Sequence, residues 1–172
     1  KGSKREAVAA TAAELEASLE ALDGFAEGVF EDVFCKRYRD ARACVRAAAV
    51  EGLAGWVRAR PKRYLDAKYL KYAAWCLDFP DARERAAAAG VLGAAFGACE
   101  GDAQREALRD FALRFVPRLG EMAHDVDERP RRAAVAALAA CLGCGLLGDL
   151  DLGDDEVAEL TDKVYSKIVD ED

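Results

Sequence analysis

Hydrophobic residues in the first part of the chain recur with alternating spacings of four and three. Polar and acidic side chains fill many of the positions between them. The apolar positions are Val8, Ala12, Leu15, Leu19, Leu22, Ala26, Val29 and Val33. This heptad pattern predicts one long helix over 4–35, with a seam that suits a coiled coil or packing along neighbouring helices. At 1.5 Å per residue, such a helix would span about 45 Å.

Beyond residue 35 the apolar pattern predicts shorter helices that are separated by turn residues. The predicted ranges are 41–59, 65–78, 81–99, 102–125, 130–147 and 155–169. Asp40 can cap the first of these helices, Pro61 is expected to end it, and Pro80 and Pro130 stand near later helix starts. Pro117 is expected to kink or split its helix, because proline removes a backbone donor. No alternating strand pattern competes with this interpretation.

A loose internal repeat runs through these helices. A D-x-x-x-x-V-R string at Asp40–Arg46 recurs in weaker form at Asp81–Arg85 and Asp127–Arg132, each time at a helix start. Intervals of roughly 40 residues between helix pairs are typical of HEAT-type repeats. The sequence therefore predicts an all-α fold, a HEAT-type α-solenoid fragment of about seven helices preceded by a long N-terminal helix. We divide the chain into a cloning remnant at 1–3, the heptad-patterned helix at 4–35 and a HEAT-like domain at 36–172.

The stretch from Tyr64 to Phe79 sorts into two faces on a helical wheel. The core face would hold Leu65, Tyr69, Tyr72, Ala73 and Cys76. A second stripe holds Lys68, Lys71 and Trp75, with Trp75 one turn from Lys71. A tryptophan beside lysines can stay reachable for a partner, and such rings are frequent anchors of binding. The alternative is that Trp75 packs against the next helix while the lysines cover its edge.

The charge balance limits the partners that the chain can bind. With 32 acidic and 25 basic residues the net charge is −7, which argues against broad nucleic-acid binding by the whole surface. A local basic stretch, opposed only by Asp66, remains a candidate DNA contact, and its alternative is a solvated loop and helix end. Its members are Arg58, Arg60, Lys62, Arg63, Lys68 and Lys71. No apolar run approaches the ~18 residues that a membrane span needs, so we expect no membrane partner.

The chain offers little of the chemistry that catalysis requires. Its one histidine, His124, stands near a predicted helix end beside Asp125. Cys141 and Cys144 form a single C-x-x-C pair, whereas a structural zinc site needs four ligands. The six cysteines are expected to be free thiols, because a large helical chain with its own apolar core does not need a disulfide framework. We therefore expect no enzyme, no cofactor and no metal site.

Three strings carry a resemblance to a known family. They are GVFEDVFCKRYRD at 28–40, YLDAKYLKYAAWCLD at 64–78 and LRDFALRF at 108–115. In this order and spacing they resemble the conserved domain of the stromalin/STAG proteins, the HEAT-repeat accessory subunits of cohesin, over a region from about Phe25 to Leu142. The resemblance implies a non-enzymatic, chromatin-associated nuclear protein that docks on the kleisin subunit. It also implies that this domain, next to kleisin, receives F/Y-x-F peptides of CTCF-, shugoshin- or Wapl-like regulators, in support of sister-chromatid cohesion and chromatin looping.

Carried over residue by residue, the resemblance assigns peptide-binding positions in all three strings. These are Tyr38, Leu70, Lys71, Tyr72, Trp75, Phe111 and Arg114. The helical wheel independently places Arg114 outside the core stripe of its helix, with Phe111 on the adjoining edge. Asp110 stands where the family has an apolar residue, and Ala67 replaces a polar one. The alternative function is DNA contact through the basic stretch 58–71, and a third is a structural spacer that only holds kleisin.

Overall fold

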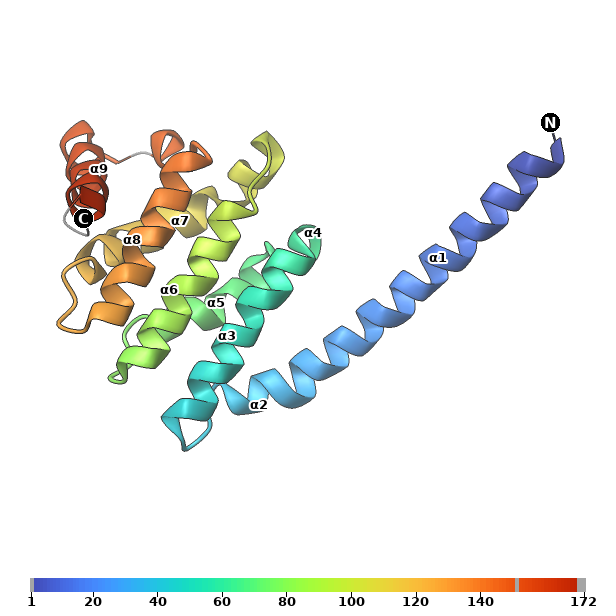
Figure 1. The fold of residues 1–172 in the computed structure, drawn as a ribbon, viewed down its shortest axis with the longest axis horizontal. Helices are drawn as coiled ribbons and strands as arrows, with labels where there is room; N and C mark the ends of the chain where they lie inside the picture. Colours follow the sequence, from blue (N-terminus) through green and yellow to red (C-terminus); the bar gives the residue numbers. More distant parts are fainter. Residues whose placement is uncertain (1, 151, 170–172) are drawn as a thin grey trace. The chain divides into compact units, whose positions relative to one another are not determined.

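The computed structural model describes residues 2–150 and 152–169, and all regular elements within these ranges are helical (Figure 1). The predicted all-α class is therefore confirmed. The chain divides into two compact units, Lys1–Arg39 and Asp40–Asp172. Each unit is described by itself. The predicted division after residue 35 stays a prediction.

The first unit is one continuous helical path with an irregular end. It comprises α1 (Gly2–Val29), a π-helical segment (Phe30–Phe34) and α2 (Cys35–Arg37). Leu15 and Leu22 of the heptad seam are 61% and 60% exposed, so what this seam packs against stays a prediction. The π-helical segment was not predicted, because nothing in its sequence distinguishes it from the α-helix before it. In this segment and just after it, aromatic rings stack along one side, Phe30 on Phe34 at 4.9 Å and Phe34 on Tyr38 at 5.8 Å.

The second unit is built from helices in two layers (Figure 1). Its elements are α3 (Ala43–Ala59), α4 (Pro61–Tyr64), α5 (Ala67–Cys76), α6 (Ala82–Gly97), α7 (Asp102–Met122), α8 (Glu128–Gly143), a 3₁₀ turn (Leu146–Asp149) and α9 (Asp154–Val169). Helices α3, α6 and α8 lie side by side in one layer, and α5 and α7 lie behind them (Figure 1). This arrangement matches the predicted HEAT-type stacking of helix pairs.

Small side chains bring the helices of the front layer close together. On α6, Ala88, Ala89 and Ala95 are fully buried. A Cβ added at Gly93 would lie 3.3 Å from the Cα atom of Ala137 on α8. Because these side chains are small, the helices of this layer fill the space between them by close approach of their backbones and not by large side chains.

A recurring arginine closes the turn that precedes each front-layer helix. In all three cases its Nη1 donates to the carbonyl groups six and five residues earlier. The bonds are Arg46 to Asp40 and Ala41 (2.6 and 3.1 Å), Arg85 to Phe79 and Pro80 (3.0 and 2.8 Å), and Arg131 to Asp125 and Val126 (2.9 and 3.0 Å). We call these three residues the arginine clasps. The arginines recur in all three repeats, but the third is Arg131 and not the predicted Arg132. The aspartates are less regular, because Asp40 stands six residues before its arginine, whereas Asp81 and Asp127 stand four residues before theirs.

Two of the clasps also join one repeat to the next. Arg46 of α3 forms an ion pair with the fully buried Glu84 of α6. Arg85 of α6 pairs with Asp125 at 2.7 Å and with Asp127 at 3.2 Å, in the turn before α8. The pKa of Asp125 lies below its ordinary value, chiefly because its carboxylate accepts hydrogen bonds from the Arg85 guanidinium. These pairs tie α3 to α6 and α6 to the start of α8.

Of two expectations about prolines, one is wrong and one is confirmed. The expected split at Pro117 is wrong, because α7 continues from Asp102 to Met122 with Pro117 inside it. Buried residues on both sides of the proline, Val116 and Leu119, hold both halves of α7 against the core. Pro61 does follow the end of α3, but it also begins α4, where its missing N–H is not needed.

Candidate functional site

Helix α5 carries most of the predicted site residues, and local signals fix its start. The Asp66 carboxylate accepts a hydrogen bond from the Lys68 N–H at 2.7 Å and so caps the helix. One face of the helix is buried in the core of the second unit. That face comprises Tyr69, Leu70, Ala73, Ala74 and Cys76. Lys68 and Trp75 are exposed on other sides of the helix.

Trp75 is the centre of a small aromatic and basic cluster. Its side chain is 50% exposed, and the edge of Tyr72 meets it at a ring-centroid distance of 5.4 Å. The Lys71 ammonium lies 5.2 Å from the Tyr72 centroid and 5.9 Å from the Trp75 centroid. The ring is therefore contacted by Tyr72 on one side, and half of it is exposed to solvent.

Helix α7 packs on α5 and carries two more predicted residues. Arg114 is exposed, and its guanidinium lies 5.4 Å from the centroid of the Phe115 ring. Phe111 is only 9% exposed and contacts Phe115 at 4.7 Å. Leu70 of α5 is fully buried. Phe111 and Leu70 therefore lie mainly beneath the surface, whereas Arg114 and Trp75 lie on it.

Tyr38 belongs to the first unit, and its placement is described only there. Its ring stacks on Phe34, and the Arg39 guanidinium lies 4.9 Å from its centroid. The other predicted peptide-binding residues all belong to the second unit.

Sequence reasoning missed Arg118, which connects the two helices of this site. Its Nε lies 2.8 Å from Oδ1 of Asp78, and its Nη1 donates to Oε2 of Glu121 at 2.7 Å. Its Nη2 donates to the Leu77 carbonyl, at the C-terminal end of α5, at 3.4 Å. A signal was present in the sequence, since Arg118 stands one turn after Arg114 and Asp78 stands three residues after Trp75. Their pairing spans 40 positions, which periodicity alone cannot reveal.

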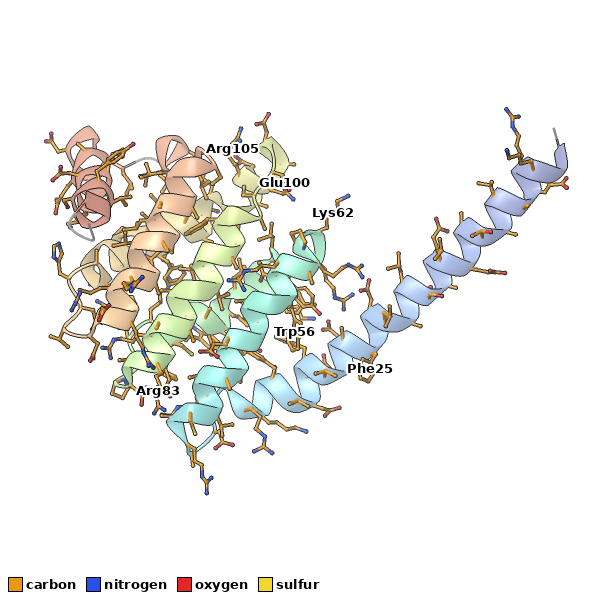
Figure 2. The ribbon with its side chains drawn as sticks, viewed as in Figure 1. Phe25, Trp56, Lys62, Arg83, Glu100 and Arg105 are labelled. Atoms are coloured by element: carbon orange, nitrogen blue, oxygen red, sulfur yellow. The ribbon has the colours of Figure 1, made fainter. Side chains whose placement is uncertain are left out.

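The residues of the basic stretch are distributed over three elements. Arg58 at the end of α3, Lys62 on α4 and Lys68 on α5 are exposed. Lys62 points away from α4, as Figure 2 shows. Arg60 and Arg63 are partly buried, and the Arg63 guanidinium lies 5.8 Å from the centroid of Tyr64. The stretch is therefore not one continuous stripe, because aromatic contacts engage part of it.

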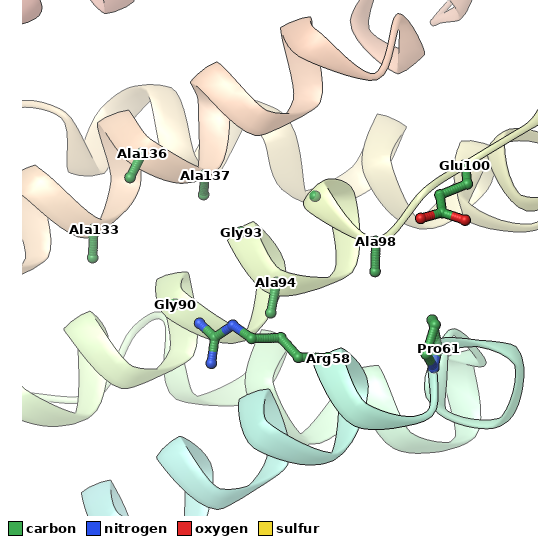
Figure 3. A pocket seen from close by; sticks show the side chains of 11 residues that line it. Arg58, Pro61, Gly90, Gly93, Ala94, Ala98, Glu100, Ala133, Ala136 and Ala137 are labelled. Carbon is green, nitrogen blue, oxygen red and sulfur yellow. The ribbon is translucent and has the colours of Figure 1, made fainter.

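A groove of about 520 Å³ crosses the front layer between α3, α6 and α8 (Figure 3). Its floor consists mainly of alanine and glycine residues of α6 and α8. Arg58 and Glu100 supply charged groups to its walls. Trp75 and Arg114 do not line it, so the groove is separate from the cluster on α5.

Groups with catalytic potential are sparse in the described ranges. No group of three or more His, Cys, Asp or Glu side chains is arranged there to hold a metal ion. Burial raises the pKa of the Cys76 and Cys141 thiols to about 12, so neither forms a reactive thiolate near neutral pH. None of the helices described is both long enough and apolar enough to span a bilayer.

Comparison with known proteins places the sequence of this chain in a family. Residues 39–116 match the stromalin conservative domain. Sister-chromatid cohesion protein 3 of Arabidopsis thaliana is 32% identical over 132 residues, which are 77% of this chain and 12% of the relative. Cohesin subunit psc3 of Schizosaccharomyces pombe is 30% identical over 132 residues, 76% of this chain and 13% of the relative. Cohesin subunit SA-3 of Rattus norvegicus is 26% identical over 129 residues, 75% of this chain and 10% of the relative.

The matched region runs from the end of the first unit to Val116, and so it includes the cluster around Trp75 as well as Arg114. The chain spans only 12–13% of the length of the first two relatives. The motif strings, the paired helices and these matches agree with one another, and the chain belongs to the stromalin family.

Proposed function

We propose that the chain is part of a cohesin accessory subunit that acts in sister-chromatid cohesion on nuclear chromatin. Within it, the surface of α5 and α7 docks F/Y-x-F peptides of chromatin regulators next to kleisin and thereby also serves chromatin looping. Two relatives carry the words cohesin subunit in their names, and a third is named as a cohesion protein. The family resemblance supplies kleisin and the peptide class. The function is binding and not catalysis.

The half-exposed Trp75 is the observation that carries this proposal. A rigid indole ring can bury a large area against a peptide aromatic at a small cost in conformational entropy. The Tyr72 edge contact and the nearby Lys71 ammonium hold the ring in place before a ligand arrives. A site that is ordered in advance spends less binding free energy on ordering.

Arg114 supplies the second half of the proposed site. Within the described ranges no carboxylate pairs with Arg114, so its guanidinium is available to an incoming ring or carboxylate. A guanidinium can stack on an aromatic face and can also form two parallel hydrogen bonds with an acidic group. Leu70 and Phe111 would act from beneath, by fixing the helices that present Trp75 and Arg114.

The test is a titration of a labelled F/Y-x-F peptide against the chain, with and without the matching kleisin segment. We expect Trp75→Ala and Arg114→Glu each to weaken binding by at least ~2 kcal/mol, the usual threshold for a binding hot spot. Tyr165→Ala is the matched control for the loss of an exposed aromatic ring, since Tyr165 of α9 is 64% exposed. Arg129→Glu of α8 is the control for charge reversal. Unchanged binding by Trp75→Ala would show that the site is wrongly placed.

DNA contact through the basic stretch is a second candidate function, which the exposure of Arg58, Lys62 and Lys68 favours. Phosphate contacts release counterions, so the affinity for duplex DNA should fall steeply with salt. Peptide binding anchored on aromatic rings should depend on salt much less. We expect Lys62→Ala to lower the slope of log K against log salt by about 1 if this residue contacts a phosphate. An unchanged slope would remove Lys62 from the DNA surface.

A further inference from the structure

We propose that Arg118 is a positioning residue for the peptide surface. Through Asp78 and the Leu77 carbonyl it locks the C-terminal end of α5 against α7, and it thereby fixes Trp75 relative to Arg114. We call this set of contacts the Arg118 clamp. The inference rests on the proposed function, since it concerns how the same surface is held ready for its ligand.

The contacts of Arg118 reach both helices. Asp78 and Leu77 follow α5 directly, with an ion-pair distance of 2.8 Å to Asp78 and a hydrogen bond of 3.4 Å to the Leu77 carbonyl. Glu121 lies on α7 itself and accepts a hydrogen bond from Nη1 at 2.7 Å. Two of its nitrogens donate hydrogen bonds and Nε lies at ion-pair distance from Asp78, so the planar guanidinium has little freedom to rotate. The side chain therefore acts as a brace between α7 and the end of α5.

The position of the clamp along the two helices gives it its role. On α7, Arg118 lies one helical turn after Arg114, on the same side of the helix. On the other side of the contact, Asp78 lies three residues after Trp75. A cation at the C-terminal end of α5 also interacts favourably with the partial negative charge of the last carbonyl groups. The clamp thus stands at the same end of the α5–α7 contact as the two exposed binding residues.

Burial indicates that the clamp controls geometry more than stability. The Arg118 side chain is 33% exposed, while Asp78 and Glu121 are 75% and 69% exposed. Ion pairs with this much solvent contact contribute little to folding free energy. The core contacts of α5 persist without the clamp, through buried residues such as Leu70 and Ala73. Loss of the clamp should therefore loosen the angle between the helices and leave the unit folded.

The experiment measures peptide affinity of the chain together with the kleisin segment for four variants. These are Arg118→Met, Arg118→Lys, Asp78→Asn and the exchanged pair Asp78→Arg with Arg118→Asp. We expect Arg118→Met and Asp78→Asn each to weaken binding about fivefold or more, with thermal midpoints close to that of the unsubstituted chain. The peptide affinity of Arg118→Lys should lie between those of the unsubstituted chain and Arg118→Met, because lysine keeps the positive charge but lacks the planar guanidinium. The exchanged pair should recover part of the affinity.

Asp78→Asn separates positioning from direct contact, because it leaves Arg118 in place. If Arg118→Met weakens binding while Asp78→Asn does not, then Arg118 touches the peptide itself and the clamp is refuted. Wild-type affinity in both variants would refute it as well.

A second readout needs no ligand and separates this inference from the proposed function. The chain can be labelled with 5-fluorotryptophan, which gives one ¹⁹F signal for Trp75 and one for Trp56. We expect Arg118→Met to shift or broaden the Trp75 signal and to leave the Trp56 signal unchanged as an internal control. If the unsubstituted chain binds no peptide, the proposed function fails, and this spectrum alone decides the clamp. An unchanged Trp75 signal would overturn it.

Discussion

Removal of the central arginine clasp should destabilise the second unit far more than removal of a surface arginine. Arg85 is 11% exposed at its side chain, and Asp125 is 8% exposed. The guanidinium donates to Asp125 at 2.7 and 2.8 Å and to the carbonyl groups of Phe79 and Pro80 at 3.0 and 2.8 Å. Arg85→Met would leave all three of these acceptors without their donor while roughly preserving the volume of the side chain.

The expected loss of unfolding free energy follows from the buried Asp125 carboxylate that remains when Arg85 is replaced. Breaking a buried ion pair by removing one partner costs roughly 3–5 kcal/mol, because the other charge remains desolvated. Asp125 keeps one hydrogen bond from the Asp127 N–H at 3.0 Å. We therefore expect a destabilisation near the lower end of this range, at about 3 kcal/mol. The free energy of unfolding would be measured by urea titration with far-UV circular dichroism, with the slope m unchanged.

The matched control is Arg132→Met, the same substitution at a side chain that is 63% exposed and pairs with Glu128 one turn away. We expect this control to lie within about 0.5 kcal/mol of the unsubstituted chain, as exposed helix pairs do. If the two variants were destabilised equally, or if Arg85→Met cost less than about 1 kcal/mol, the clasp would be an incidental contact.

Other features lead to further expectations. The lowered pKa of Asp125 means that its stabilisation is complete above the ordinary aspartate pKa of about 4 and is lost as the pH falls through the lower folded-state value, so Asp125→Asn should flatten the acid limb of a stability-against-pH curve. Gly90→Ala should stabilise the unit by about 0.5–1 kcal/mol, because a Cβ there meets nothing within 4 Å. Gly93→Ala should bring no such gain in the same urea assay, because its Cβ would lie 3.3 Å from the α8 backbone. In a thiol-labelling time course at pH 8, the exposed Cys44 should react rapidly and the buried Cys141, with a pKa of about 12, only after unfolding. Labelling of Cys141 as fast as that of Cys44 would contradict its burial.

Local features of the sequence were sufficient to predict the longer helices, but not the short α4 or the π-helical segment. The starts of α5 and α6 are set by residues within a few positions and lie within two residues of their predicted places. The expected cap at Asp40 is wrong, because α3 begins after Arg42 and has no side-chain cap. The wheel for α5 correctly separated Tyr69 and Cys76, which are buried, from the exposed Trp75. It also placed Tyr72 in the core, whereas the structure leaves Tyr72 partly exposed beside Trp75. A helical wheel gives the direction in which a side chain leaves its helix, but it does not show whether the neighbouring helices extend far enough to cover that side chain.

Features that depend on distant residues could not be read in this way. The Arg118 clamp and the pair of Arg85 with Asp125 each join positions about 40 residues apart, at a distance where side-chain patterns carry no pairing information. Pro117 was misjudged for a related reason, because proline weakens an isolated helix while the packing of α7 against its neighbours keeps it continuous. The family resemblance, and not periodicity, pointed to Arg114 as a partner of Trp75.

The alanine-rich packing of the front layer has a thermodynamic consequence. Many of the fully buried side chains there are single methyl groups, such as those of Ala88, Ala95 and Ala137. Unfolding would therefore expose less apolar area per residue than in a core of leucine and phenylalanine. Because exposed apolar area sets the heat-capacity increment, this unit should have a small one, and its free energy of unfolding should change only gently with temperature. A solenoid built in this way would lose little stability on cooling.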